Sequence, residues 1–150
     1  MGGVPRYLEE ILPSQSAESN IQGLCFQKEG FLFCEFERIF SDLFSNRSAI
    51  YKTIVERLAE GPCELKDIYT ALKVEKNTLV SHYVEDLVTA GFVSRDFTWH
   101  LKTGIDSKLS HYRLQDNYLR FYLKYIESNK KNIEKQGLKL LPQWQSALGL

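Results

Sequence analysis

Residues 46–116 contain three short helical patterns followed directly by two runs of β-forming residues, and this order constrains the fold more than any other feature. Apolar side chains repeat at intervals of three and four residues over 50–59, 65–72 and 77–89. Gly61-Pro62 ends the first helical pattern and Gly91 ends the third. The connection between the second and third patterns is tight, which is typical of a helix-turn-helix.

The two β-forming runs predict a hairpin. Residues 92–100 and 110–114 are rich in β-forming side chains, and the polar segment 102–108 between them predicts the tip. A hairpin that directly follows a helix-turn-helix is a wing. We therefore predict a winged helix-turn-helix over residues 46–116, within an α+β chain that is mostly α.

The segments on either side are predicted to be helical. Residues 1–45 should hold helices from Pro5 to Pro13, from a Ser19 or Asn20 cap to Lys28, and from Phe31 to Phe44. Residues 117–150 should begin with a helix to about Gln136 whose first half is apolar almost all round. If the core takes Leu119, Leu123 and Ile126, an aromatic face stays exposed and predicts a homodimer through residues 117–136. That face would comprise Tyr118, Phe121, Tyr122 and Tyr125.

Composition excludes several classes of protein. The 19 Lys and Arg residues balance 19 Asp and Glu, so the chain lacks a broad basic field. Its three cysteines form no CxxC motif, which predicts free thiols in a reducing cytoplasm. No apolar run approaches the roughly 20 residues of a membrane span, and no signal peptide precedes the first helix, so we expect no membrane association. The three histidines are too widely spaced to predict a metal site.

No set of residues suggests a nucleophile, a base and an oxyanion site together, so we expect a binding protein and not an enzyme. The third helix of the helix-turn-helix should turn Leu79, Tyr83 and Leu87 to the core and polar side chains to solvent. The start of this helix and the wing offer side chains for bases or phosphates of double-stranded DNA. These are Lys76, Asn77, Thr78, Ser81, His82, Arg95, Lys102 and Lys108. Glu85 and Asp86 oppose this hypothesis, and a solvated surface or a protein-binding surface remains the alternative.

Three stretches carry a resemblance to a known family. GGVPRYLEEI at the start, the winged-helix pattern, and YRLQDNYLRFYLKYI near the end occur in this order over nearly the whole chain. Together they resemble the region behind the nucleotide-binding core in archaeal-type ATPases of the AAA+/STAND group that carry a DUF234 segment. The resemblance implies that residues 1–45 are a helical lid remnant. It also implies that a phosphate-binding loop precedes this region in the parent protein and that a nuclease-like segment follows residue 150.

The same resemblance implies roles for the first residues. Gly2, Gly3 and Pro5 would lie at the adenine of the nucleotide, and Arg6 would sense the nucleotide; the alternative is a helix start with a solvated Arg6. The chain has no GxxxxGK[ST] and no Asp-rich strand for Mg²⁺, so we expect no cofactor here, while ATP and Mg²⁺ are implied for the intact parent.

The implied function is a non-catalytic, regulatory winged-helix domain of an ATPase. Its expected partners are double-stranded DNA and the rest of the parent ATPase. An interdomain or protein-protein interaction module and a free-standing transcription regulator are the alternatives.

Overall fold

The chain folds into two compact units. The computed structural model describes residues 4–100 and 104–136, apart from the side chains of 99, 100, 105–109 and 136. One unit is the continuous segment Phe40–Arg120, and the other combines the flanking segments Met1–Ile39 and Phe121–Leu150. The sequence predicted three consecutive segments, 1–45, 46–116 and 117–150. The middle segment corresponds to the continuous unit, whereas the two flanks share one unit; we call these the central unit and the flanking unit.

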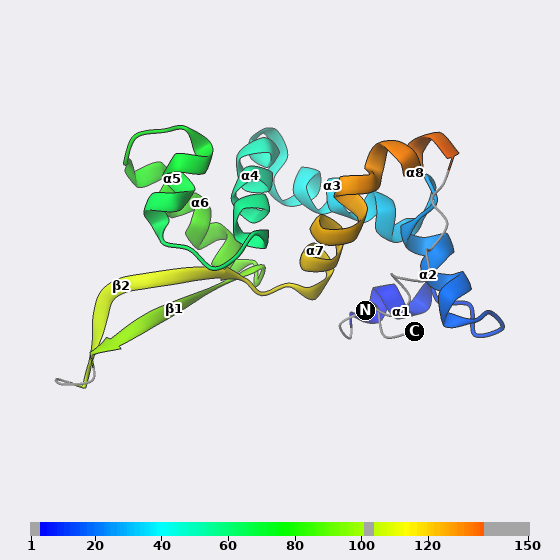
Figure 1. Cartoon of the computed structure of the whole chain (residues 1–150), viewed down its shortest axis with the longest axis horizontal. Coiled ribbons are helices and arrows are strands. Elements are labelled where there is room, and N and C mark those ends of the chain that lie inside the picture. Colours follow the sequence, from blue (N-terminus) through cyan, green and yellow to red (C-terminus); the bar gives the residue numbers. More distant parts are fainter. Residues whose placement is uncertain (1–3, 101–103, 137–150) are drawn as a thin grey trace. The chain divides into compact units, whose positions relative to one another are not determined.

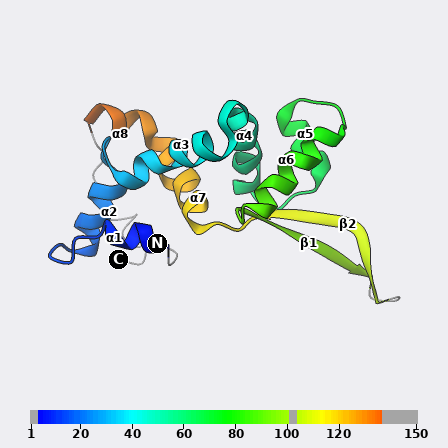
Figure 2. The same ribbon diagram turned by 180° about the vertical axis from the view of Figure 1, so that it is seen from behind.

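The central unit is a winged helix-turn-helix, as predicted. It contains helices α4 (Ser48–Ala59), α5 (Leu65–Leu72) and α6 (Thr78–Thr89), and then strands β1 (Val93–His100) and β2 (Ile105–Leu114). The strands pair antiparallel, with Val93 opposite Leu114 and an irregularity between Phe97 and Trp99. Figures 1 and 2 show this hairpin extending away from the three helices. Strand β2 begins five residues earlier than predicted, so the tip is shorter than residues 102–108.

An isolated β-bridge attaches the hairpin to the helices. Cys63, in the connection between α4 and α5, forms a bridge with Tyr112 of β2. The Cys63 amide donates to the Tyr112 carbonyl at 3.0 Å, and the Tyr112 amide donates to the Cys63 carbonyl at 2.8 Å. Both residues are buried. The base of the wing is therefore fixed to the helix-turn-helix by backbone hydrogen bonds as well as by packing.

Local sequence signals position α6. Asn77 is its N-cap, since its side chain accepts a hydrogen bond from the Val80 amide at 3.1 Å. Lys73, directly after α5, has a φ of 55°, and this left-handed residue makes the turn between the two helices tight. The core side of α6 consists of Val80, Val84 and Leu87. The expectation that Leu79 faces the core is wrong, because 59% of it is exposed.

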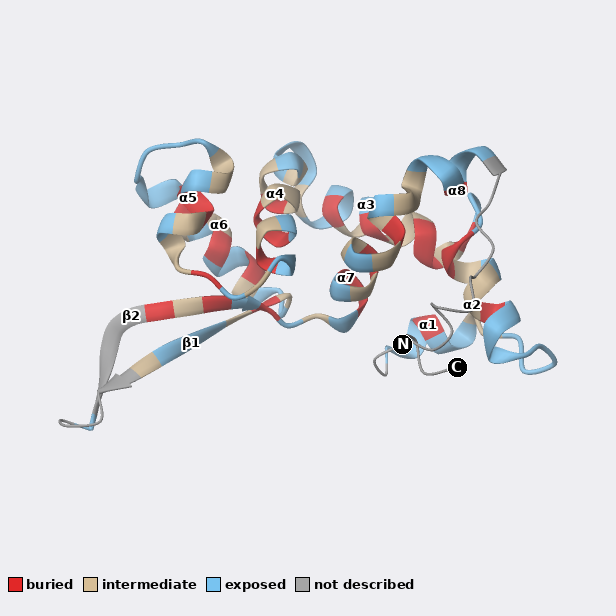
Figure 3. Ribbon diagram, viewed as in Figure 1, coloured by how far each residue is buried: buried red, intermediate tan, exposed pale blue. Residues whose placement is uncertain are grey.

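The flanking unit has its own apolar core. It contains α1 (Pro5–Glu9), α2 (Ala17–Cys25), the first part of α3 (Phe31–Phe44), and the helical run after residue 121. The rings of Phe36 and Tyr122 stack with centroids 4.3 Å apart and planes within 2° of parallel. Figure 3 shows the buried stripes of these helices. The fully buried side chains of this core include Phe26, Phe36, Tyr122, Ile126 and Ile133.

The loop before α2 differs from the prediction. Ser16, and not Ser19 or Asn20, caps α2, and the helix ends at Cys25 instead of Lys28. Asn20 lies buried inside the helix and binds the loop: its side-chain oxygen accepts from the Leu12 amide at 2.7 Å, and its amide donates to the Leu12 carbonyl at 3.0 Å. The buried Asn20 amide is thus satisfied by hydrogen bonds, and these bonds fix the loop to α2.

The last helix is less regular than predicted. It comprises α7 (Asn117–Phe121), the π-helical turn η2 (Tyr122–Ile126), the 3₁₀ turn η3 (Glu127–Asn129) and α8 (Lys130–Gln136). The expected exposed aromatic face is absent, because Tyr118 is 9% exposed, Tyr122 is fully buried, and Phe121 and Tyr125 are half-buried. None of the exposed large apolar side chains of residues 4–100 and 104–136 lies in this run. The homodimer through residues 117–136 stays a prediction, without the fully exposed aromatic face on which it was based.

Candidate nucleic-acid interface

The start of α6 and the turn before it form the exposed polar surface of the central unit. Lys76, Asn77, Thr78 and His82 are all exposed, whereas Ser81 is half-buried. The Tyr69 hydroxyl donates to the Asn77 carbonyl at 3.0 Å and lies 3.4 Å from the Ser81 hydroxyl oxygen. These contacts fix the turn between α5 and α6, so the exposed side chains are presented from a rigid support.

The predicted base-contacting residues divide into two groups. The Asn77 oxygen caps α6 and its amide donates to the Glu75 carbonyl at 3.2 Å, so this side chain has a structural role. Ser81 is similarly placed beside Tyr69. Thr78 and His82 have no hydrogen bond or ion pair from their side chains within the described part of the chain. Thr78 and His82 are therefore the two predicted residues best placed to reach a ligand.

Arg95, on β1, connects the hairpin to α6. Its guanidinium donates to the Glu85 carboxylate at 3.0 Å and, through Nε, to the Ser110 hydroxyl at 3.0 Å. The guanidinium carbon also lies 4.9 Å from the centre of the Phe97 ring and 5.6 Å from that of Tyr112. Arg95 was predicted to contact phosphate, and the structure places it in an internal network of the wing.

Both acidic residues in the second half of α6 have partners. Glu85 is paired with Arg95, and Asp86 accepts a hydrogen bond from the Tyr51 hydroxyl. Burial raises the pKa of Tyr51, and the hydrogen bond to Asp86 raises it further, so this phenol stays a donor at neutral pH. The pairing of Glu85 reduces the repulsion of a phosphate chain that the sequence alone suggested.

Sequence analysis overlooked Lys73. It is exposed beside Lys76 in the turn between α5 and α6, and neither lysine has an ion pair among the described residues. Lys73 was not identified as a binding residue because it ends a helix, and apolar periodicity indicates such a residue only as the end of a pattern. Lys102 lies outside the described residues, and only the backbone of Lys108 is described, in β2.

Two apolar side chains share this surface. Val74 is 42% exposed in the turn, and Leu79 is 59% exposed in the first turn of α6. Neighbouring exposed apolar side chains can contact a thymine methyl group or a partner protein.

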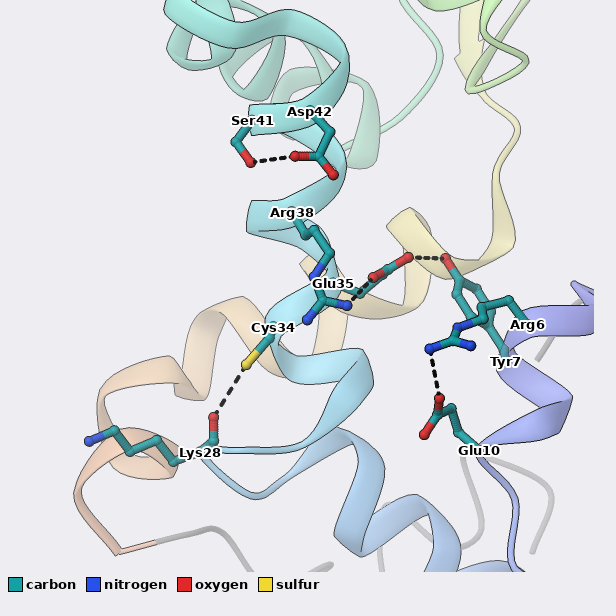
Figure 4. Close-up of polar contacts among 9 residues, drawn as sticks. All are labelled: Arg6, Tyr7, Glu10, Lys28, Cys34, Glu35, Arg38, Ser41 and Asp42. Atoms are coloured by element: carbon teal, nitrogen blue, oxygen red, sulfur yellow. Dashed lines mark hydrogen bonds and ion pairs between the residues drawn. The ribbon is translucent and has the colours of Figure 1, made fainter.

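The residues that the resemblance assigns to a nucleotide lie in the flanking unit. Gly2 and Gly3 are outside the described residues, and Pro5 begins α1. The Arg6 guanidinium is 3.2 Å from the Glu10 carboxylate (Figure 4). It is also 3.4 Å from the Glu9 carboxylate and lies over the Phe31 ring. Arg6 thus pairs with Glu9 in α1 and with Glu10, the C-cap of that helix.

Two further properties concern the described residues only. Residues 4–100 and 104–136 contain no cluster of three His, Cys, Asp or Glu side chains close enough to hold a metal ion. In the same part of the chain, no helix combines the length and the apolar composition that a bilayer crossing requires.

Comparison with known proteins gives distant relatives. No sequence model of a known protein family matches the chain. The chain is 28% identical over 135 residues to the uncharacterized protein MJECL04 of Methanocaldococcus jannaschii, which covers 89% of this chain but 29% of that protein. A solved structure concerning regulation of DNA binding of Bordetella bronchiseptica BpsR by 6-hydroxynicotinic acid has a TM-score of 0.41 and 13% identity, covering 79% of this chain and 91% of that one. The winged-helix assignment rests on the order and pairing of the chain's own elements.

Proposed function

We propose that the central unit binds double-stranded DNA, with the first half of α6 in the major groove. The observation that carries the proposal is the contrast along α6. The turn before α6 presents Lys73 and Lys76 without ion pairs among the described residues, whereas Glu85 in the second half of α6 pairs with Arg95. Thr78 and His82 would face the base edges, and the lysines would contact phosphates.

Binding of a labelled 20-base-pair duplex, measured by fluorescence anisotropy, tests this proposal. With three or four phosphate contacts, a fourfold increase in salt should weaken binding by roughly 40- to 150-fold. Lys73→Glu and Lys76→Glu should each weaken it, and Lys28→Glu is the matched control because Lys28 is exposed in the loop after α2. Equal losses in all three variants, or no complex at low salt, would contradict DNA binding by α6.

A protein-binding surface is the second candidate, and exposed Val74 and Leu79 favour it. If the surface binds protein, Leu79→Ser should abolish association with the partner, while Lys76→Glu should change it little. If it binds DNA, the lysine variant should have the larger effect on duplex binding, since phosphate contacts supply most non-specific affinity. The same two variants therefore separate the two candidates.

We further propose that this region works as a regulatory, non-catalytic part of a larger ATPase. The motif resemblance supports the ATPase part of this proposal. The uncharacterized relative, in which the matching segment is 29% of the protein, supports only that such a segment can belong to a longer chain. In such a protein the winged helix would couple the nucleotide state to DNA or to a partner domain. A phosphate-binding loop in the same polypeptide would distinguish this role from that of a free-standing transcription regulator.

The isolated chain should neither hydrolyse ATP nor bind it tightly. It contains no phosphate-binding loop, and Arg6 is held by Glu9 and Glu10. Calorimetry with ATP and Mg²⁺ should show no saturable heat. Micromolar affinity would contradict this expectation and would place a complete nucleotide site within these 150 residues.

A further inference from the structure

The helical run that ends the flanking unit has one basic face and one buried face. Lys124, Lys131 and Lys135 are exposed and follow each other at intervals of seven and four residues. Their counterparts Tyr122, Ile126 and Ile133 are fully buried at intervals of four and seven. Residues spaced in this way share one side of a helix. The three lysines thus form a stripe, which we call the basic stripe.

The irregular turns within this run preserve the stripe. The π turn η2 advances less per residue than an α-helix, and the 3₁₀ turn η3 that follows advances more. The two deviations in rotation per residue oppose each other. The side chains of α8 therefore point in nearly the directions that an uninterrupted α-helix from the residues before η2 would give them. The complete burial of Ile133, in register with Tyr122 and Ile126, supports this compensation.

Among the described residues of the flanking unit, no carboxylate forms an ion pair with the basic stripe. Lys130, which lies beside it in sequence, is the lysine that pairs with Glu37, at 2.9 Å. The Lys124 ammonium lies 5.1 Å from the centre of the Tyr125 ring, which leaves its charge without a carboxylate partner in the described region. No ion pair among the described residues involves Lys131 or Lys135. The stripe extends roughly 16 Å along the helix at about 1.5 Å per residue.

The surroundings of the stripe favour one kind of anionic partner. A helix that binds a membrane surface exposes large apolar side chains next to its cations. Here the apolar face is buried in the core, and no exposed large apolar side chain of the described residues lies in this run. Lysine ammonium groups on a flexible stem act as point charges, which suits them to phosphates. Duplex nucleic acid, with its closely spaced phosphates, fits this surface better than a bilayer.

We propose that Lys124, Lys131 and Lys135 bind the phosphate backbone of duplex nucleic acid without sequence preference, as a site separate from α6. This inference goes beyond the proposed function of the central unit and stands without it. Each lysine that contacts a phosphate should contribute about 0.9 to the slope of log affinity against log salt concentration.

The test uses the full chain and a labelled 20-base-pair duplex of arbitrary sequence, titrated at several NaCl concentrations. Lys131→Glu and Lys135→Glu should each weaken binding by roughly 3- to 15-fold at low salt and lower the salt slope by about one. Lys28→Glu changes the net charge equally in the same unit but off the stripe, so it should leave the slope unchanged. Circular dichroism of each variant checks that the helix remains folded.

Any of the following outcomes would overturn the proposal. The first is an equal effect of Lys28→Glu and the stripe variants, which would indicate net charge alone. The second is an unchanged salt slope in both stripe variants. The third is a loss of binding to phosphatidylserine vesicles but not to duplex, which would assign the stripe to a lipid surface. Loss with Lys76→Glu alone would support α6 and reject the stripe, whereas loss with the stripe variants alone would do the reverse.

Discussion

Arg95 shows how a single side chain can determine the geometry of the wing. Its hydrogen bonds to Glu85 and Ser110 join α6, β1 and β2, and its guanidinium lies near the rings of Phe97 and Tyr112. Sequence analysis identified Arg95 only as a wing cation, because its partners are 10 and 15 residues away. Its position within a network depends on strand pairing, which periodicity alone does not specify.

Arg95→Ala should lower the free energy of unfolding by about 1 kcal/mol. A partly exposed ion pair contributes about 0.2–1 kcal/mol, and a cation–π contact contributes about 0.5–1 kcal/mol. Urea denaturation followed by circular dichroism measures the change. Arg113→Ala is the control, because Arg113 pairs with Asp96 across the same hairpin at an exposed site and should cost less than about 0.5 kcal/mol. Equal decreases in the free energy of unfolding for the two variants would show that the Arg95 network contributes no more stability than an exposed ion pair.

Cys25 offers a prediction that depends on pH. Burial raises the pKa of its thiol from 9.0 to about 12. Between these values the unfolded thiol ionises while the native one stays protonated, so the unfolded state binds fewer protons and stability falls as pH rises. From pH 8 to 10.5, the wild type should lose about 1–2 kcal/mol more than Cys25→Ala in urea denaturation. Parallel losses in the two proteins would contradict the raised pKa.

At the scale of elements, apolar periodicity predicted the helices of the winged helix and their order. Asn77 is the N-cap of α6, and this assignment depends on a local property, because Asn favours the N-cap position. The exposure of Leu79 was not predicted. It depends on how α6 is rotated against α4 and α5, and the apolar pattern of the first helical turn does not determine that rotation. The π turn at Tyr122–Ile126 was missed for a similar reason, because tertiary packing and not propensity selects it.

Two glycines near α2 provide a matched test of packing. A Cβ at Gly30 would meet the Leu24 carbonyl oxygen at 2.5 Å, whereas a Cβ at Gly23 would meet nothing within 4 Å. Gly30→Ala should therefore destabilise the flanking unit by about 1–3 kcal/mol, because backbone atoms must move. Gly23→Ala lies within α2 and should stabilise the unit by up to about 1 kcal/mol. The midpoint temperatures of thermal unfolding should shift in opposite directions for the two variants. A shift in the same direction would contradict the close approach of the Leu24 carbonyl to Gly30.

On the scale of the whole molecule, the chain's two flanks form one unit, and the winged helix lies between them in the sequence. The Lys130–Glu37 ion pair joins residues that are 93 positions apart. The sequence indicated the middle segment because its pattern is local and continuous. It did not indicate that the flanks share a core, because each flank has an ordinary amphipathic pattern that many partners could cover.

This arrangement predicts different behaviour for two truncated chains. The segment 40–120 contains all of the described core of its own unit, including Phe40, whose ring lies 6.4 Å from that of Phe92. It should fold alone and unfold cooperatively in urea. The segment 1–120 lacks Tyr122, Ile126 and Ile133, which are fully buried against the first helices. Removing several such side chains lowers the free energy of unfolding by more than the few kcal/mol of stability that a small unit has. The flanking unit should therefore not fold in the 1–120 chain.

Limited proteolysis and NMR separate these outcomes. The 40–120 fragment should give dispersed amide signals, and its duplex binding should stay sensitive to Lys76→Glu, because the proposed α6 surface lies wholly within it. In the 1–120 chain, residues 4–39 should be cleaved rapidly while the central unit persists, since a helix without its core partner is marginal in water. Protection of residues 4–39 in that chain, or an unfolded 40–120 fragment, would contradict the division into two units. The full chain, in which both units should resist the protease, is the reference for both measurements.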